Sequence, residues 1–132
     1  MLRIKKMTQE DLEFAVRLTD TMNWNLVEED FEFMIMLEPE GCFVLLSDAE
    51  RIGVATTISF GKVGWIGNVI VKEGYRRHGG GSLLVRAAID YLTARGVETT
   101  GLYAYLDKIP FYTRQDFRHE SGFTVLRGRR FS

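Results

Sequence analysis

The spacing of apolar residues along the chain predicts an alternation of strands and helices. Where apolar and β-branched residues alternate or run together over a few positions, we expect strands. Where they return every three or four positions, we expect helices that bury one face. The predicted strands are residues 2–5, 42–47, 52–60, 65–71, 99–105 and one or two strands within 117–130. The predicted helices are residues 8–22, 27–37, 82–95 and 107–114.

Local signals mark the ends and the buried faces of these helices. Thr8, with Asp11 three residues later, predicts a capping box at the start of the first helix. Gly96 follows the last periodic residue of the third helix and is a typical stop. The buried face predicted for 27–37 is Phe31, Met34 and Ile35, with Met36 at its margin. The stripe predicted for 82–95 is Leu83, Leu84, Ala87, Ala88, Tyr91 and Leu92.

The order of these elements indicates the fold class. Short polar turns at 48–51 and 61–62 join three consecutive strands, so the first half of the sheet is expected to be antiparallel. Helices then alternate with the remaining strands, which predicts an α/β protein built on an α+β mixed sheet. A length of 132 residues, 45% of them hydrophobic and 27% charged, is typical of one domain, so we expect residues 1–132 to form a single domain.

Composition narrows the surroundings in which the protein is expected to work. No run of eighteen apolar residues is present, and the N-terminus lacks the apolar core of a secretory signal. Cys42 is the only cysteine, and His78 and His119 lack the spacing of metal ligands. We therefore expect a cytoplasmic protein without a metal, and neither a membrane nor a nucleic acid as its partner.

The net charge of −1 hides an uneven distribution. Residues 1–40 hold ten acidic and four basic residues, a balance of −6, and residues 41–132 hold eight acidic and thirteen basic residues, a balance of +5. The two parts of the chain are suited to ligands of opposite sign, or they are simply two solvated surfaces.

A basic, glycine-rich turn at 72–81 links the strand at 65–71 to the helix at 82–95. The first turn of a helix has unpaired N–H groups and a partial positive charge, and glycines let another group approach the backbone. This arrangement is typical of phosphate binding. The Walker pattern is absent, and Leu84 stands where the third glycine of the dinucleotide fingerprint would fall.

Residues 76–81 read Arg-x-x-Gly-x-Gly, which resembles the pyrophosphate-binding motif of the GNAT acetyltransferase superfamily, Gln/Arg-x-x-Gly-x-Gly/Ala. Residues 110–117 resemble the family's Phe-Tyr-x-x-x-Gly-Phe signature, with Asp116 in place of the glycine. The order of elements agrees over nearly the whole chain. The resemblance implies a GNAT-like acyl-CoA N-acyltransferase fold with a central mixed, mostly antiparallel sheet flanked by helices.

The same resemblance implies acetyl-CoA as the cofactor, lying where the strands at 65–71 and 99–105 splay apart. The pantetheine arm would pair with the backbone of the first of these strands, and the pyrophosphate would bind the glycine-rich turn. The cofactor-binding residues so implied are Val69, Ile70, Val71, Arg76, Arg77, His78, Gly79, Gly80, Gly81 and Ser82.

The reaction implied is N-acetyl transfer to a primary amine by direct attack in a ternary complex. Tyr112 stands where the family places a tyrosine near the coenzyme sulfur, and a phenol can donate a proton to a leaving thiolate. Alternatively, Tyr112 is an aromatic residue that packs in the hydrophobic core and has no catalytic role. The general base stays open, because 65–71 contains no acid and the amide of Asn68 cannot take a proton.

The partner implied is an amine acceptor, either a small molecule or a peptide, and the acidic N-terminal part would border it. Whether the protein forms a homodimer stays open. The alternative function is a non-catalytic acyl-CoA-binding sensor or partner module. Two observations favour it: the strand at 65–71 contains no acidic residue, and Asp116 replaces the glycine of the family signature.

Overall fold

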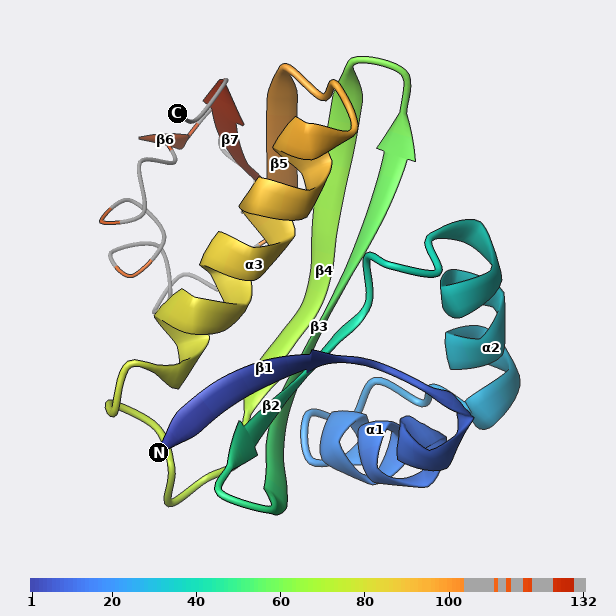
Figure 1. Cartoon of the computed structure of the whole chain (residues 1–132), viewed down its shortest axis with the longest axis vertical. Coiled ribbons are helices and arrows are strands. Elements are labelled where there is room, and N and C mark those ends of the chain that lie inside the picture. The colour runs from blue at the N-terminus through green and yellow to red at the C-terminus, as the bar shows by residue number, and fades with distance from the viewer. Residues whose placement is uncertain (104–110, 112–113, 115–117, 120–124, 130–132) are drawn as a thin grey trace.

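The computed structural model describes residues 1–103, 111, 114, 118–119 and 125–129, and a sheet runs through it with helices on both sides (Figure 1). The strands are β1 (Leu2–Lys6), β2 (Phe43–Ser47), β3 (Glu50–Phe60), β4 (Val63–Val71), β5 (Thr99–Tyr103), β6 (Arg118–His119) and β7 (Val125–Arg129). The helices are α1 (Leu12–Asp20), preceded by the 3-10 turn η1 (Gln9–Asp11), α2 (Glu28–Leu37) and α3 (Gly80–Ala94).

The strands of the described residues form one sheet in the order β1-β2-β3-β4-β5-β7-β6. Every neighbouring pair is antiparallel except β4 and β5, which are parallel because α3 crosses over between them. The predicted fold class, a mixed and mostly antiparallel sheet flanked by helices, is confirmed.

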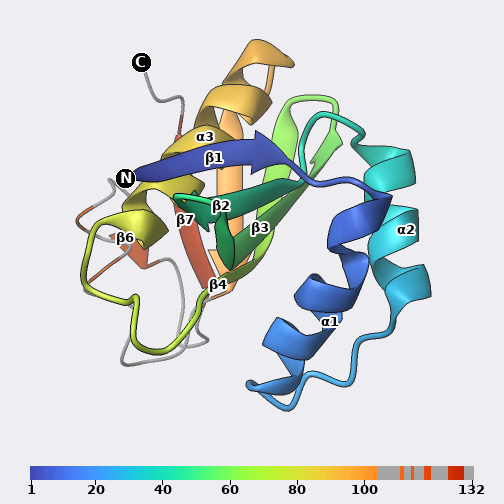
Figure 2. The ribbon, with the colours of Figure 1, turned by 60° about the horizontal axis from the view of Figure 1, so that its bottom comes forward.

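Two helical layers cover opposite faces of the sheet (Figure 2). On one face α3 packs onto β3 and β4, and its Val85, Ile89 and Leu92 form an apolar cluster with Ile66 of β4 and Leu102 of β5. On the other face α1 and α2 bury a second cluster against β2, β3 and β4. The α3 stripe is therefore centred one position later than predicted, and Leu83, expected inside, is 41% exposed.

The first helix begins as its sequence predicts. Asp11 Oδ2 accepts hydrogen bonds from the backbone N–H of Thr8 (2.8 Å) and from its hydroxyl (3.2 Å), which confirms the pairing of Thr8 with Asp11. This first turn is 3-10 rather than α-helical, and the α-helix starts at Leu12.

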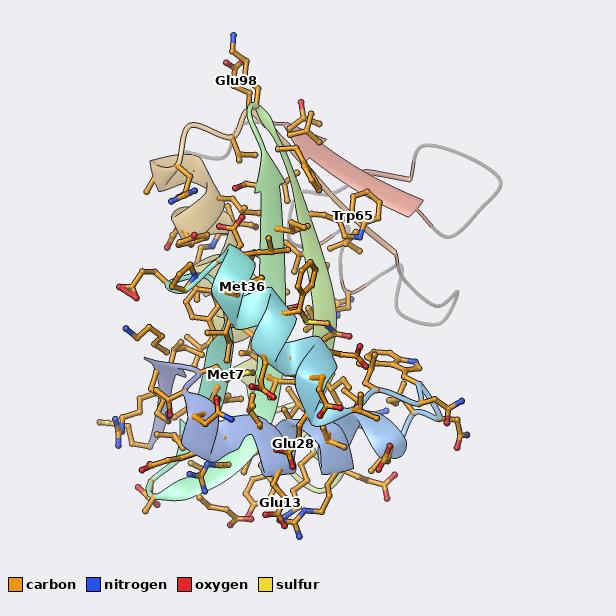
Figure 3. All side chains as sticks on the ribbon, turned by 90° about the vertical axis from the view of Figure 1, so that its right-hand side faces the viewer. Met7, Glu13, Glu28, Met36, Trp65 and Glu98 are labelled. Atoms are coloured by element: carbon orange, nitrogen blue, oxygen red, sulfur yellow. The ribbon has the colours of Figure 1, made fainter. Side chains whose placement is uncertain are left out.

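The buried face of α2 is narrower than its sequence suggests. Phe31 is fully buried and Met34 and Ile35 are half-buried, as predicted, but Met36 is 66% exposed. A helix that lies on one face of a sheet buries a single stripe, and Met36 follows Ile35 by one position and so turns away from it. Figure 3 looks onto this side of the molecule, with Met36 on the outer side of α2.

The turn between β2 and β3 is shorter than predicted. Only Asp48 and Ala49 form it, and Glu50 and Arg51 already belong to β3. Two-residue hairpin turns need positive φ, which Asp48 adopts at 53°. The charged side chains of Glu50 and Arg51 had suggested a longer loop, but both find partners on neighbouring elements.

The elements predicted after residue 98 can be compared with the structure only at its described residues. The strand expected at 99–105 is present as β5, and the stretch expected at 117–130 contains the antiparallel pair β6 and β7. Of the helix expected at 107–114, Phe111 is helical and Arg114 lies in a turn, while Tyr112 lies outside the described residues. Among the described residues no helix is both long and apolar enough to cross a membrane.

Candidate functional site

Among the described strands, β4 has a neighbour on both sides only along residues 63–66. Its parallel pairing with β5 runs from Val63 opposite Thr99 to Ile66 opposite Leu102. Beyond Ile66, at residues 67–71, the only described strand that pairs with β4 is β3. We call the side of 67–71 that faces away from β3, where no described strand pairs, the open edge of β4.

The backbone of Val69 and Val71 faces the open edge. The N–H of Lys72 donates to the carbonyl of Ile52 on β3 (2.7 Å), so this position points toward β3. In an antiparallel pair the residues that bond to the neighbouring strand alternate, so Val71 and Val69 point the other way. In agreement with this, the Val71 carbonyl accepts its hydrogen bond from the Arg76 side chain (Nε to O, 2.7 Å) rather than from β3.

A bulge lies where β4 loses its second neighbour. Val54 and Thr56 of β3 stand opposite Ile70 and Gly67, so two residues of β4, Asn68 and Val69, share the place opposite Ala55. Asn68 takes a left-handed conformation with φ of 54°. Bulges bend a strand and re-aim its side chains and backbone, and they are common next to active sites. The sequence signal for it was Gly67-Asn68 within a β-branched run.

The turn from β4 to α3 contains three residues with positive φ. These are Gly74 (97°), Arg77 (68°) and Gly79 (89°). Residues of alternating handedness turn successive backbone N–H groups toward one side, which makes a concave site for an anion. For an arginine this conformation costs on the order of 1–2 kcal/mol, so the surrounding structure must hold Arg77 in place.

Contacts with the β2–β3 hairpin anchor this turn. The Tyr75 hydroxyl donates to Glu50 Oε1 (2.7 Å), and Lys72 Nζ lies 3.2 Å from Glu50 Oε2. Hydrogen bonds from Tyr75 and Lys72 lower the pKa of the Glu50 carboxyl, and the same carboxylate raises the pKa of Tyr75. No sequence pattern points to a role for Tyr75 or Glu50, and these contacts identify them as residues that hold the turn.

The first turn of α3 contains two glycines, Gly80 and Gly81, at positions where a side chain would crowd neighbouring residues. The first α-helical hydrogen bond runs from the Leu83 N–H to the Gly79 carbonyl (3.1 Å), so the amides of Gly80 and Gly81 precede the helical ladder. A Cβ on Gly80 would lie 2.5 Å from Leu45 Cδ2, and one on Gly81 would lie 3.3 Å from Phe111 Cζ. The Arg-x-x-Gly-x-Gly motif thus positions backbone N–H groups at a helix N-terminus.

The predicted cofactor-binding residues fall into two groups that meet at the open edge. Backbone positions 69–71 lie on β4, while Arg76, Arg77, His78, Gly79, Gly80, Gly81 and Ser82 form the turn and the start of α3. The side chains of Arg76, Arg77 and His78 are exposed, whereas Ile70 is buried against the α1 and α2 layer. A role of Ile70 would therefore come from its backbone alone.

Phe111 brings the second predicted motif to the same place. Its ring is half-buried against the core between α3 and the sheet, in contact distance of Gly81. The predicted catalytic residue, Tyr112, is its chain neighbour and lies outside the described residues. Its role at the coenzyme sulfur stays a prediction.

The two buried carboxylates of the described residues are bound by structural partners. Asp11 is fully buried and accepts from Lys5 Nζ (2.5 Å) and from Arg51 Nε (2.7 Å). Burial opposes ionisation of Asp11, but these hydrogen bonds and the one from Thr8 outweigh it and hold its pKa below the ordinary value. Asp11 is therefore a structural charge rather than a general base.

Glu38, the second buried carboxylate, joins three elements at the far end of the sheet. Its Oε2 accepts from the backbone N–H and the hydroxyl of Ser59 (both 2.8 Å), and its Oε1 accepts from the hydroxyl of Tyr91. Burial opposes its ionisation, yet these hydrogen bonds and the nearby Arg95 leave its pKa lowered. Burial and the same carboxylate raise the pKa of Tyr91 to about 12.

Over residues 5–117 the sequence matches the acetyltransferase (GNAT) family. The chain belongs to this family. A search of curated proteins finds no match. GNAT acetyltransferases take acetyl-CoA as their donor, and the residues present here fit that cofactor. The N-terminus of α3 presents backbone N–H groups of the kind that bind phosphate, and no described strand pairs with β4 at 67–71 on the side away from β3.

Solved structures share this fold. Ard1 from Thermoplasma volcanium is 17% identical, with a TM-score of 0.88, and each chain covers 99% of the other. The ribosomal-protein-S18-alanine N-acetyltransferase from Escherichia coli is 20% identical, with a TM-score of 0.82, over 100% of this chain and 96% of its own. A putative acetyltransferase from Pyrococcus horikoshii is 27% identical over 90% of this chain, with a TM-score of 0.78, but only 44% of its own length is covered.

Proposed function

We propose that this GNAT acetyltransferase transfers the acetyl group of acetyl-CoA to a primary amine, on a small molecule or a peptide, by direct attack within a ternary complex. One observation carries the proposal: the open edge of β4 runs directly into the turn and the N-terminus of α3. A helix N-terminus suited to phosphate, followed directly by a strand edge where no described strand pairs, suits a ligand that has a pyrophosphate at one end and an extended arm at the other.

The N-terminus of α3 and the open edge of β4 each have a role in the proposed reaction. Bound acetyl-CoA supplies an acetyl group activated as a thioester. The amides at the start of α3 hold the pyrophosphate, and the backbone of Val69 and Val71 holds the arm along β4. As the amine nitrogen bonds to the carbonyl carbon and the C–S bond breaks, the hydroxyl of Tyr112 donates a proton to the departing thiolate. The proton that the attacking nitrogen then releases returns the phenolate to the phenol.

The acceptor amine must lose its proton before it attacks, since alkyl amines of the lysine type have a pKa of about 10. Strand β4 offers no acid for this step, and Asp11 and Glu38 are held in structural pairs. We therefore propose that ordered water conducts the proton to solvent. The acidic first turn of α2, with Glu28 and Glu29 exposed, raises the local concentration of a cationic amine.

A panel of amines tests the proposal directly. The protein is incubated with acetyl-CoA and amino acids, polyamines, amino sugars or peptides, and free coenzyme A thiol is measured. Each amine is compared with the same compound already acetylated on its nitrogen, which controls for hydrolysis of the thioester. Transfer to one class of amine supports the proposal, and thiol release that is equal with blocked and free amines contradicts it.

The same experiment separates the alternative function. Because β4 carries no acid, a protein that binds acyl-CoA without transferring the acyl group is the second candidate. Such a module would bind acetyl-CoA in calorimetry and release no thiol with any amine in the panel.

A further inference from the structure

Asn68 has a backbone conformation that is unusual for the middle of a strand. It lies in β4 with φ of 54° and forms the bulge together with Val69. A residue other than glycine rarely takes this conformation, and asparagine tolerates it because its short side chain can bond locally. Such a conformation persists only where the surroundings hold it.

The side chain of Asn68 supplies that hold. Its Nδ2 donates to the Thr56 hydroxyl on β3 (3.0 Å) and lies 3.4 Å from the sulfur of Met34 on α2. The Thr56 hydroxyl in turn donates to the carbonyl of Gly67 (3.2 Å), the residue just before Asn68. Two hydrogen bonds therefore tie the bulge to β3: the Asn68 side chain donates to the Thr56 hydroxyl, and that hydroxyl donates to the backbone carbonyl of Gly67.

This circuit depends on the direction of each hydrogen bond. The carboxamide nitrogen has two hydrogens, one directed at an oxygen and one at a sulfur, and the hydroxyl accepts once and donates once. Thr56 is 4% exposed, so water has little access to replace a lost partner. Glycine at position 68 would keep the positive φ but remove the first donor, and valine at 56 would remove the relay.

We propose that Asn68 is a positioning residue for the acetyl donor: through Thr56 and Met34 it holds the β4 bulge so that the backbone of Val69 and Val71 stays aligned along the open edge. This role rests on the proposed function, because it takes the open edge as the place of the pantetheine arm. Asn68 acts through the backbone next to it and exchanges no proton.

Acetyl-CoA affinity, measured by calorimetry at a temperature where every variant is folded, tests this role without an acceptor. Asn68→Gly and Thr56→Val are each expected to raise Kd about tenfold, roughly the weight of one backbone hydrogen bond. Thr56→Ser keeps the relay and is expected to stay within about twofold of the wild type, far below that weight.

Thr57→Val is the matched control for Thr56→Val. Thr57 is the next residue on β3, is equally 4% exposed and also donates its hydroxyl to a glycine carbonyl, that of Gly41 (2.8 Å). Gly41 lies beside Tyr91 of α3, away from the open edge. Thr57→Val should lower the melting temperature much as Thr56→Val does and leave Kd unchanged.

The outcomes separate the positioning role from the proposed function. Equal effects of Thr56→Val and Thr57→Val on Kd, or wild-type affinity in both Asn68→Gly and Thr56→Val, would overturn the role of Asn68. Binding of acetyl-CoA without transfer to any amine removes the proposed transfer and leaves the affinity comparison decisive. Should Asn68→Gly fail to fold, the two threonine variants still decide. No binding by the wild type at millimolar acetyl-CoA overturns both.

Discussion

The hydroxyl of Tyr91 donates to a buried carboxylate, and its removal should cost a measurable and pH-dependent amount of stability. Tyr91 lies on α3 and donates to Glu38, the C-cap residue of α2, which is 3% exposed. Tyr91→Phe deletes this one hydrogen bond. The ring keeps its edge-on contact with Phe43 (centroids 6.3 Å apart) and its place under the Arg95 guanidinium (5.7 Å).

The expected loss follows from the charge on the acceptor. A hydrogen bond to an ionised group contributes about 1.5–3 kcal/mol to stability. Glu38 keeps its two hydrogen bonds from Ser59, so the carboxylate is not left bare. For a chain of this length a loss of 1 kcal/mol lowers the melting temperature by roughly 4 °C, so Tyr91→Phe should melt roughly 6–12 °C lower at pH 7.

The sign of the pH dependence follows from the lowered pKa of Glu38. A carboxyl whose pKa is lower in the folded state adds stability above its unfolded pKa, and this stability is lost as the pH falls through the folded value. Without Tyr91 the folded pKa of Glu38 moves up toward the ordinary 4.5. The difference in stability between Tyr91→Phe and the wild type should therefore be full at pH 7 and shrink below pH 4.5.

Denaturant unfolding of four proteins measures this coupling: the wild type, Tyr91→Phe, Glu38→Gln and the double variant. If the hydrogen bond is made to the carboxylate, Tyr91→Phe should cost less in the Glu38→Gln background than in the wild type. A loss below about 0.5 kcal/mol at pH 7, the size of an ordinary surface substitution, or a loss that stays constant from pH 7 to pH 3, would refute the reasoning.

Three further predictions address the site and the N-terminal layer. Gly79 and Gly96 flank α3 with the same φ of 89° and open space around them, so Gly79→Val and Gly96→Val should strain the backbone to the same extent. Calorimetry should find that acetyl-CoA affinity is lost only in Gly79→Val. Equal affinities of the two variants would show that the turn is not part of the cofactor site. Tyr112→Phe should lower kcat about 10²–10⁴-fold with little change in acceptor KM, and a kcat within about twofold, well under that general-acid range, would make Tyr112 structural. Asp11→Asn should destabilise toward the lower end of about 3–5 kcal/mol, because its partners Lys5 and Arg51 both reach solvent, and the effect in denaturant unfolding should fade as the pH falls below 3.8; a neutral result would contradict the charge pairing.

Much of the fold could be predicted because its signals are local. Helix α3 has a full apolar stripe and a glycine stop, and the capping pair Thr8 and Asp11 is encoded within four residues. The exposure of Met36 could not be predicted, because the sequence of a short helix with several neighbouring apolar residues does not show which of them face the sheet. Which face is covered depends on the sheet beneath, and no local pattern describes it.

The turn between β4 and α3 could be predicted from local residues, whereas the open edge of β4 was expected only from the family resemblance. The glycines and basic residues of the turn predict a helix N-terminus of the kind that binds anions, and α3 begins there. The open edge depends on where β5 stops pairing with β4, which is a relation between strands more than thirty residues apart. The anchoring of the turn by Glu50 was equally hidden, because Tyr75 lies 25 positions away in the chain.

The single parallel pairing in the sheet also bears on how the chain folds. Strands β2, β3 and β4 are joined by two-residue turns, so their contacts are local and form at little cost in loop entropy. Strand β5 reaches β4 only after the intervening α3 has crossed the sheet, and the ladder it gains spans four residue pairs. The antiparallel meander should therefore assemble first, with β5 and the strands beyond it added late, once α3 is seated.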